Sequence, residues 1–332
     1  MSNRMSKALP AITVISVGPD FPTATLAAEL PRANALLDLA TKGVPLRALR
    51  MLDQVSRNWL VRHANAHLGE IDAIARMLDR PGTYFLSVNY EWGCTCRVGP
   101  SADHASSRLI RVLDWRTPGL GRNIIAANVE GATGSFITLT WPGYTGVLQG
   151  MAPGRFSAAL NQAPMRRSGG FLAFDWAMNK RRVWGMPHGT PAHLLRAVFE
   201  RAKTFEEARR TLIETPIASP AIFSLAGIAP QDTCVIERTE VAAQVHDGPG
   251  VAANNWQAAG WKGRPRGDDS AGRACQMASV ELAFDDALPW LQAPILNQYT
   301  RLVAIADAKQ GRLMAQGYEA DGAATAVLHY SA

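Results

Sequence analysis

After a long helical stretch, the chain changes character near Gly82 and continues as a series of short strand-like runs. From about Ala24 to Leu78, Leu, Ala, Arg and Met recur at three-to-four spacing, which is typical of helices. Beyond Gly82 the runs are apolar, β-branched or aromatic, and turns such as residues 141–143 separate them. Because strands, helices and strands follow one another, we expect a layered α+β architecture with mostly antiparallel sheets.

The predicted elements lie along the whole chain. Strands are expected at residues 11–17, 83–92, 94–98, 109–115, 123–130, 135–141, 156–162, 221–227, 232–238, 240–247, 312–318 and 325–331. Helices are expected at about 190–214 and 272–284, and a loop at about 257–272. Thr190 is a predicted helix cap because Pro191 follows it. Thr204 and Glu207 form a predicted capping box.

Composition and charge exclude several classes of protein. Apolar residues make up 47% of the 332 residues, which is enough for a sizeable core. The sequence contains no run of about 18 apolar residues, so no membrane span is predicted. The net charge is +6, but the basic residues form no arm or stripe, so nucleic-acid binding is not expected. The excess charge favours weak attraction to acidic lipid surfaces or carboxylated substrates. The basic residues at 180–182 and 166–167 are interpreted as solvated loop charge.

Four cysteines are too few for a disulfide scaffold in a chain of this length. Cys94 and Cys96 are too close together for an ordinary bridge, so we expect a reducing compartment. The N-terminal residues contain no long apolar segment followed by a small-residue cleavage site. A cytoplasmic location is therefore predicted.

The segment from Gly93 to Arg97, Gly-Cys-Thr-Cys-Arg, is the first that could carry chemistry. A thiol is nucleophilic as a thiolate, and nearby cations favour that form. On this segment alone, a buried cysteine pair on a strand is the preferred interpretation. A metal site is a third possibility, but no second Cys-x-Cys or Cys-x-x-Cys motif accompanies it.

Arg111 and Asp114 follow in a predicted strand. Alternation puts them on opposite faces unless a bulge intervenes, and both could approach Cys94 if the two strands pair. Ordinary surface charges are the alternative. Residues 143–161 combine turn glycines with aromatic residues, which alone indicates hairpins. Asn254-Asn255 is either a turn or a donor to an oxyanion.

Together these segments resemble the acid ceramidase and N-acylethanolamine acid amidase family, relatives of the choloylglycine hydrolases among the N-terminal-nucleophile hydrolases. The resemblance runs from about Tyr84 to Trp256. The matching segments are Cys94-Thr95-Cys96 for the family's Cys-Thr-Ser, Ile110 to Trp115 for its Gly-Arg-Asn-Leu-Asp motif, Gly143 to Asn161 for its two glycine-rich runs, Ala253-Asn254-Asn255 for its Thr-Asn-Tyr turn, and Asp268 to Arg273 for its Asp-Asp-x-Arg segment. Each motif alone is weak, but five in the right order are specific.

Four positions depart from the family pattern. Val112 replaces an Asn, Asn255 replaces a Tyr, and Cys96 replaces a Ser. Gly93 stands where relatives often carry a larger residue. These departures leave the class standing, and two of them, at Val112 and Asn255, concern positions where substrate preference would be set.

The resemblance implies a four-layer αββα N-terminal-nucleophile hydrolase fold with two mostly antiparallel sheets and an N-terminal helical segment. It also implies self-cleavage of the Gly93–Cys94 bond, with residues 1–93 as the small fragment and 94–332 as the catalytic domain. The freed α-amine has an unperturbed pKa of about 8 and would activate the thiol. The thiol then attacks an amide, forming a thioester that water hydrolyses.

In this scheme the catalytic residues are Cys94, Arg111, Asp114, Asn254 and Arg273. The carboxylate of Asp114 holds the new ammonium, Arg111 steadies the thiolate or a substrate oxygen, and Asn254 donates to the oxyanion. Arg273 is a partner of Asp114 or of the leaving group. The expected substrate-binding residues are Asn161, Trp115, Tyr144 and Asn255. The substrate is a small N-acyl amide, and no metal or organic cofactor is expected.

Other interpretations stay open. A Cys-His-Asp hydrolase using His246-Asp247 or His104 would need no self-cleavage. The thioester could pass to an amine, which makes an acyltransferase, or the fold could bind acyl chains without catalysis. The helical segment 24–78 is expected to be a cap, with weak membrane-surface contact as the alternative. The acyl chain, the amine part and the oligomeric state are not readable from the sequence.

Two residue groups have a structural interpretation that is preferred to a functional one. His63 and His67 are predicted at i and i+4 on a helix, where a solvated face is favoured over a metal site because no Glu follows His63. Ordinary core packing is the preferred interpretation of four tryptophans, and the lining of an acyl pocket is the alternative. They are Trp115, Trp141, Trp176 and Trp184.

Overall fold

The computed structural model describes residues 8–88 and 91–332, and its strands form two large sheets. The first sheet has eight strands in the order β1-β4-β5-β6-β7-β8-β9-β10. Their bounds are β1 Thr13–Val17, β4 Ile125–Val129, β5 Phe136–Thr140, β6 Gln149–Ala152, β7 Phe156–Gln162, β8 Ala221–Ala226, β9 Thr233–Arg238 and β10 Ala243–Asp247. The pair β1–β4 is parallel, and the other neighbouring pairs are antiparallel.

The second sheet is antiparallel throughout, in the order β11-β2-β3-β12-β13-β14, with β15 also paired to β13. Its strands are β2 Trp92–Pro100, β3 Ser107–Trp115, β11 Gly250–Ala252, β12 Thr300–Asp307, β13 Arg312–Glu319, β14 Gly322–Ala323 and β15 Leu328–Ser331. The central strands β3 and β12 are buried along almost their whole length, because both of their faces are covered.

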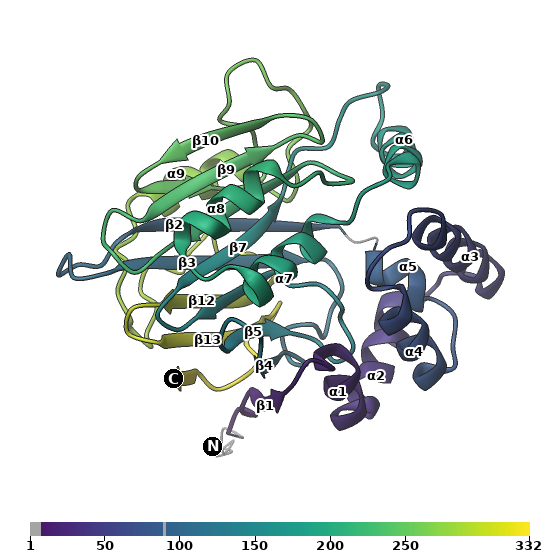
Figure 1. Ribbon diagram of the computed structural model, residues 1–332, viewed down its shortest axis with the longest axis horizontal. Coiled ribbons are helices and arrows are strands. Elements are labelled where there is room, and N and C mark those ends of the chain that lie inside the picture. Colours follow the sequence, from purple (N-terminus) through teal and green to yellow (C-terminus); the bar gives the residue numbers. More distant parts are fainter. Residues whose placement is uncertain (1–7, 89–90) are drawn as a thin grey trace, which may run out of the picture.

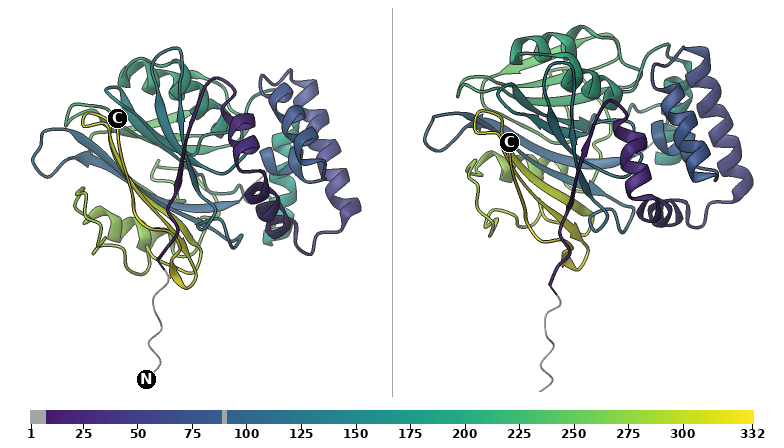
Figure 2. Two further views of the ribbon diagram at one scale, coloured as in Figure 1. Left: turned by 90° about the horizontal axis from the view of Figure 1, so that it is seen from below. Right: turned by 60° about the horizontal axis from the view of Figure 1, so that its bottom comes forward.

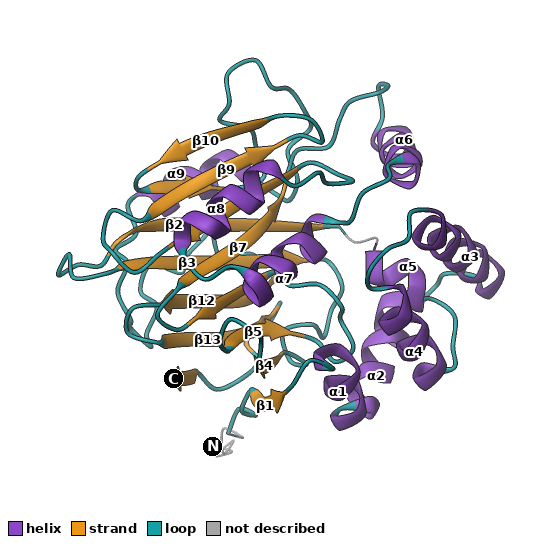
Figure 3. Ribbon diagram, in the orientation of Figure 1, coloured by secondary structure: helices purple, strands orange, loops and turns teal. Residues whose placement is uncertain are grey.

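The two sheets pack face to face, and helices cover their outer faces (Figure 1, Figure 3). Helices α7 (Pro191–Arg201) and α8 (Phe205–Glu214) lie over the first sheet. Helix α9 (Ser270–Ala278) lies against β2 and β11 of the second sheet. The four layers confirm the predicted αββα arrangement.

The remaining helices form a group beside one end of the sheets (Figure 1, Figure 2). Their bounds are α1 Phe21–Ala28, α2 Leu30–Thr41, α3 Leu46–Arg62, α4 Leu68–Leu78, α5 Thr83–Val88 and α6 Leu172–Gly185. The buried Trp59 of α3 donates a hydrogen bond to Met186 O at 2.9 Å, just beyond α6. None of the described helices has both the length and the apolar composition needed to span a membrane.

The predicted strand at residues 83–92 is wrong over its first part. Thr83–Val88 form helix α5, residues 89–90 lie outside the described part of the chain, and strand β2 begins at Trp92. A short apolar run cannot be assigned to a strand or a buried helix from periodicity alone. Here the helix is supported by packing against α3 and α4.

Helix α6 and strand β12 were not predicted, and α9 ends at Ala278 rather than near residue 284. The only buried residue of α6 is Asp175, so this helix lacks the periodic apolar face that identifies a helix in a sequence. All eight residues of β12 are buried, which removes the alternation typical of a half-exposed strand.

The predicted helix caps are confirmed in part. Thr190 Oγ1 accepts a hydrogen bond from His193 N at 3.2 Å. At α8, Thr204 Oγ1 accepts from Glu207 N at 3.1 Å. The Glu207 carboxylate accepts from Lys203 N rather than from Thr204 N, so the capping box is not closed as predicted.

Candidate active site

Two adjacent strands, β2 and β3, bring the predicted nucleophile and its neighbours together. In their antiparallel register, Cys96 lies opposite Arg111, and Gly93 lies opposite Asp114. Because side chains alternate along a strand, Cys94 and Arg111 share the face that meets the first sheet, and Asp114 is on the face toward α9. The register runs without a shift, so the prediction that Arg111 and Asp114 lie on opposite faces is confirmed.

The Cys94 thiol is buried between the sheets beside a cation. Its Sγ is 3.0 Å from Arg111 Nη2 and 3.9 Å from Leu160 O. Arg111 also donates to Leu148 O, Leu160 O and Gln149 Oε1 at 2.7–2.9 Å. Burial raises the pKa of the Cys94 thiol, and the charge of Arg111 opposes that rise. The thiol therefore needs a base as well as a cation to ionise near neutral pH.

The backbone of Cys94 belongs to a second network, built on Asn254 and Arg273. The Cys94 N–H donates to Asn254 Oδ1 at 2.7 Å, and Asn254 Nδ2 donates to Gln162 O at 2.7 Å. Arg273 Nη1 donates to Cys94 O and Thr95 Oγ1, both at 2.8 Å, and its Nη2 donates to Asn254 Oδ1 at 3.2 Å. The nitrogen, carbonyl and thiol of one residue are thus held by three different side chains.

Asp114 completes this network from the neighbouring strand. Its Oδ2 is 3.3 Å from Arg273 Nη1, and its Oδ1 accepts a hydrogen bond from Thr300 Oγ1 at 3.0 Å. Burial raises the pKa of Asp114, and the charge of Arg273 opposes this. A Cβ on Gly93 would lie only 3.4 Å from Asp114 Cβ and 3.3 Å from Gly267 Cα. The small residue before Cys94 therefore fits a tight space beside this carboxylate.

Asn161 holds the turn that carries Asn254. Its Nδ2 donates to Ala252 O at 3.1 Å and to Ala253 O at 3.2 Å. Its Oδ1 accepts a hydrogen bond from Cys96 Sγ at 3.0 Å. The side chain of this predicted substrate-binding residue is fully buried, and these contacts hold the turn that carries Asn254.

Asn255 acts on the same turn from the other side. Its Oδ1 accepts from Ser270 Oγ at 2.7 Å, and that Ser270 oxygen accepts from Asn254 N at 2.9 Å. Three residues of the site were not predicted from the sequence: Gln162, Gly267 and Thr300. Two of them act through one backbone oxygen or a missing side chain, which leaves no motif, and Thr300 lies on the strand that was not predicted. Ser270 lies in the matched segment from Asp268 to Arg273, but no role was predicted for it.

An apolar pocket of about 190 Å³ lies between the helical group and the sheets. It is lined by Leu36, Leu37 and Leu78 from α2 and α4, and by Leu86 of α5. The sheet side contributes Trp115, Trp141 and Tyr144, two of which are predicted substrate-binding residues. Trp115 packs against Trp141 at 5.5 Å between ring centroids. Of the four tryptophans for which core packing or an acyl pocket was expected, Trp115 and Trp141 pack in the core and also line this pocket. Trp176 and Trp184 lie on α6 and do not line it.

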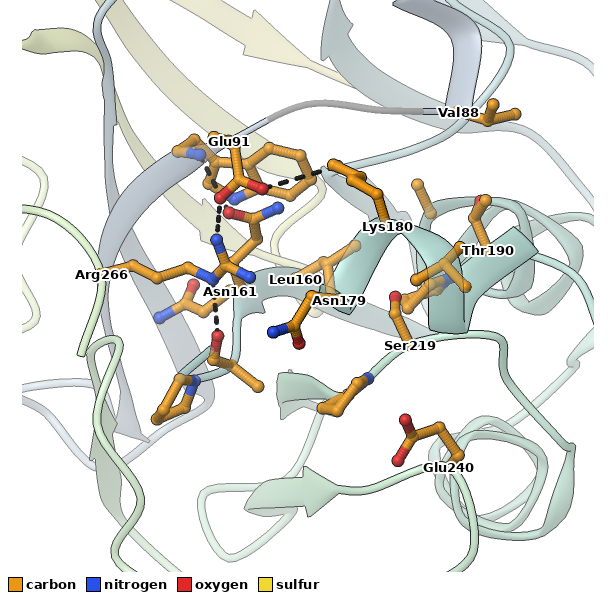
Figure 4. Close-up of a pocket in the computed structure, with 18 of the residues that line it drawn as sticks. Val88, Glu91, Leu160, Asn161, Asn179, Lys180, Thr190, Ser219, Glu240 and Arg266 are labelled. Carbon is orange, nitrogen blue, oxygen red and sulfur yellow. Dashed lines mark hydrogen bonds and ion pairs between the residues drawn. The ribbon is translucent and has the colours of Figure 1, made fainter. Parts of the chain in front are cut away.

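A second pocket, of about 70 Å³ and more polar, borders the same region (Figure 4). Trp92, Leu160 and Gln162 form its wall, and two of these contact the Cys94 network directly. Trp92 packs against Trp115 of the apolar pocket at 5.3 Å between ring centroids. A pair of packed tryptophan rings therefore connects the linings of the two pockets.

The alternative Cys-His-Asp arrangement is not formed. His246 is on β10 and its Nε2 is 3.1 Å from Glu237 Oε2, and His104 lies in the β2–β3 connection. Within residues 8–88 and 91–332, no histidine is within hydrogen-bond distance of Cys94 Sγ. Among these described residues, the polar groups within hydrogen-bond distance of this sulfur are the Arg111 guanidinium and the Leu160 carbonyl.

The prediction that His63 and His67 share a helix face is wrong. α3 ends at Arg62 and α4 begins at Leu68, so the two histidines lie in the connection between them. His67 Nδ1 is 3.1 Å from Glu70 Oε2. In the described part of the chain, no group of three His, Cys, Asp or Glu residues is placed to hold a metal ion.

Sequence comparison finds similarity to acid ceramidases. The chain is 27% identical to acid ceramidase of Heterocephalus glaber over 226 residues, which are 62% of this chain and 55% of that protein. It is 36% identical to acid ceramidase of Homo sapiens over 104 residues, which are 31% of this chain and 25% of that protein. The matches therefore span about half or less of the length of these relatives. No family model matches the chain.

Comparison of structures finds a shared fold. A Caenorhabditis elegans N-acylethanolamine-hydrolyzing acid amidase ortholog superposes with a TM-score of 0.52 and 23% identity, covering 71% of this chain and 100% of that chain. The motifs around Cys94, the similarity to acid ceramidases and this fold agree with one another. They confirm that the chain resembles the acid ceramidase and N-acylethanolamine acid amidase-like family of N-terminal-nucleophile hydrolases.

Proposed function

We propose that this protein is an amide hydrolase that uses Cys94 as its nucleophile after cutting its own chain between Gly93 and Cys94. One observation carries the proposal: the nitrogen and the thiol of Cys94 are both buried, yet each lies in its own polar network. A cysteine that only filled a core would need neither a cation 3.0 Å from its sulfur nor an Asn at its backbone N–H. The similarity to acid ceramidases supports the same reaction class.

Self-cleavage supplies the base that the buried thiol lacks. Attack of the Cys94 sulfur on the Gly93 carbonyl carbon breaks the peptide bond and forms a thioester, and the thiol proton passes to the departing nitrogen. Water then hydrolyses the thioester, which leaves a carboxylic acid on Gly93 and a free thiol and α-amine on Cys94. An α-amine has an unperturbed pKa of about 8, so it can accept the thiol proton near neutral pH.

During turnover the same sulfur attacks the amide carbon of the substrate, the amine leaves with a proton, and water releases the acid. Arg111 stabilises the thiolate, and Asp114 stabilises the ammonium form of the α-amine. Among the described residues, Asn254 Nδ2 donates to Gln162 O alone, which leaves its second N–H for the oxyanion. Arg273 aligns both Asp114 and Asn254.

The apolar pocket supports an acyl chain as the carboxylic-acid part of the substrate. Its walls are aliphatic and aromatic, and burial of each CH₂ of a chain there contributes about 0.8 kcal/mol. Trp115 and Tyr144 line this pocket and lie within the matched segments 110–115 and 143–161. The substrate class is accordingly a linear N-acyl amide.

Mass spectrometry of the purified intact protein tests the proposal. We expect two fragments, residues 1–93 and 94–332, and hydrolysis of a linear N-acyl amide by the processed protein. Cys94→Ala should remain a single chain without activity, because it lacks the sulfur. Cys275→Ala is the matched control, because Cys275 is also a free cysteine but is exposed, and it should process normally. Cleavage or hydrolysis by Cys94→Ala would rule out the proposed role.

Contact with a membrane surface stays a prediction. Leu46, Met51 and Val61 are large apolar residues exposed on α3, and Arg47 and Arg50 belong to the same helix. Such a mixed surface suits weak attachment to acidic lipids. The cytoplasmic location is likewise retained as a proposal.

A further inference from the structure

Glu91, three residues before Cys94, forms ion pairs with two cations in the polar pocket. Its Oε1 is 3.5 Å from Lys180 Nζ, and its Oε2 contacts Arg266 Nη1. Figure 4 shows the Glu91 carboxylate between these two side chains. The pocket thus already holds a carboxylate, and this carboxylate belongs to the segment that self-cleavage releases from Cys94.

The two cations are built into the structure around the active site. Arg266 Nε donates to Ala163 O at 2.8 Å, its backbone N–H donates to Asn254 O at 3.3 Å, and its carbonyl accepts from Arg273 Nη2 at 3.2 Å. Lys180 comes from α6, and its side chain is only 12% exposed. Both charges are therefore fixed at the pocket rather than free in solvent.

The lining of the pocket carries more positive than negative charge, and loss of the Glu91 carboxylate would increase that excess. Its charged lining consists of Lys180, Arg182, Arg266, Glu91 and Glu240. Glu240 is satisfied separately, because it pairs with Arg182 Nε at 2.7 Å and with Arg166 Nη2 at 2.9 Å. Of the described carboxylates, only Glu91 pairs with Lys180 and Arg266. A second carboxylate that displaced it would meet two charged donors.

We propose that Glu91 occupies the site of a substrate carboxylate, so that the mature enzyme acts on N-acyl amino acids in preference to neutral N-acyl amides. This inference rests on the proposed function. The acyl chain would occupy the apolar pocket and the carboxylate of the amine part would meet Lys180 and Arg266. Trp92 of the polar pocket packs against Trp115 of the apolar pocket, and Leu160 and Gln162 of the polar pocket contact the Cys94 network.

The test compares substrates that differ only in this charge. Processed protein, verified by intact mass, is assayed with N-lauroylglycine, N-lauroylglycinamide and N-lauroylethanolamine. We expect kcat/KM for the glycine conjugate to exceed that for the glycinamide roughly tenfold to hundredfold, as for a hydrogen-bonded charge. Lys180→Met should reduce this ratio to a few-fold. Arg181→Met is the control, because Arg181 is the exposed neighbour on the same helix and does not line the pocket, so the ratio should be unchanged.

A second variant tests directly whether the substrate carboxylate displaces that of Glu91, and it leaves Lys180 and Arg266 in place. Glu91→Gln removes the competing charge, so the preference for the glycine conjugate should rise. Equal turnover of the glycine conjugate and its glycinamide by the wild-type protein would overturn this inference but leave the proposed function standing. Turnover of none of the three amides would overturn the proposed function and this inference with it. A preference that Lys180→Met and Glu91→Gln both leave unchanged would show that the carboxylate binds elsewhere.

Discussion

At the scale of single residues, the proposed mechanism depends on how the buried Cys94 thiol is ionised. Burial raises the pKa of Cys94, and the Arg111 guanidinium at 3.0 Å is the first of the effects that lower it. The α-amine that self-cleavage would create adds a base, but it does not replace this cation. Arg111 is therefore expected to control the thiolate fraction even in the processed protein.

Replacing Arg111 should shift the titration of the thiol to higher pH. Without the guanidinium, the largest effect that lowers the Cys94 pKa is lost, so less thiolate exists at a given pH. In the processed protein, the pH profile of iodoacetamide alkylation should move upward slightly for Arg111→Lys and further for Arg111→Met. The kcat of Arg111→Met should fall roughly 100- to 1000-fold. A profile identical to that of the wild type in both variants would exclude this role.

Residue identities alone could reveal only part of this network. Cys94, Arg111, Asp114 and Asn254 were predicted because they match motifs, and the structure brings their networks together. Residues that act through a backbone oxygen, such as Gln162, leave no such pattern. The ion pairs of Glu91 also join segments far apart in the sequence, so the basic patch at Lys180 could only be interpreted as solvated charge.

At the scale of elements, the loop before α9 fixes the position of Arg273. Gly267 has a φ of +68°, and a Cβ there would lie 2.8 Å from Arg273 Nη2. This loop also approaches β2 closely, since the Gly267 Cα is 3.3 Å from the ideal Cβ position of Gly93. The sequence predicted a loop here, but its packing depends on pairings that only the assembled sheets provide.

Gly267→Ala should slow self-cleavage by displacing Arg273 from Cys94 O and Asn254. Gly260→Ala is the matched control, because Gly260 has a φ of +82° but nothing within 4 Å of its added Cβ. Each substitution should lower the free energy of unfolding by roughly 1–2 kcal/mol from backbone strain. Only Gly267→Ala should also slow the appearance of the 94–332 fragment, followed by mass spectrometry. Equal processing rates in the two variants would contradict this placement of Arg273.

The elements also show where periodicity stops being informative. The half-exposed helices α3 and α4 have clear apolar faces and were predicted. The fully buried β12 and the largely exposed α6 have no alternation to detect, and both were missed. Strand β12 supplies Thr300 to Asp114, so this error also hid part of the site.

At the scale of the whole molecule, the proposed cut at residue 93 does not coincide with a boundary in space. β1 pairs with β4 over five residues and forms an edge of the eight-stranded sheet, and Trp92 and Gly93 continue β2 in the other sheet. Of the helices between them, α1 packs on β1 and β4, and α2, α4 and α5 form one side of the apolar pocket. The segment 1–93 therefore contributes to both sheets as well as to the helical group.

The two fragments should therefore stay together after cleavage. Native size-exclusion chromatography of the processed protein should give one species that contains both fragments, and denaturation should separate them. Residues 94–332 expressed alone should aggregate, because loss of β1 exposes the edge of β4 and loss of the helices exposes the apolar pocket. Co-expression with residues 1–93 should restore solubility. A soluble, active 94–332 fragment on its own would show that the N-terminal segment is a removable cap, and the acyl pocket would then have to lie within the sheets.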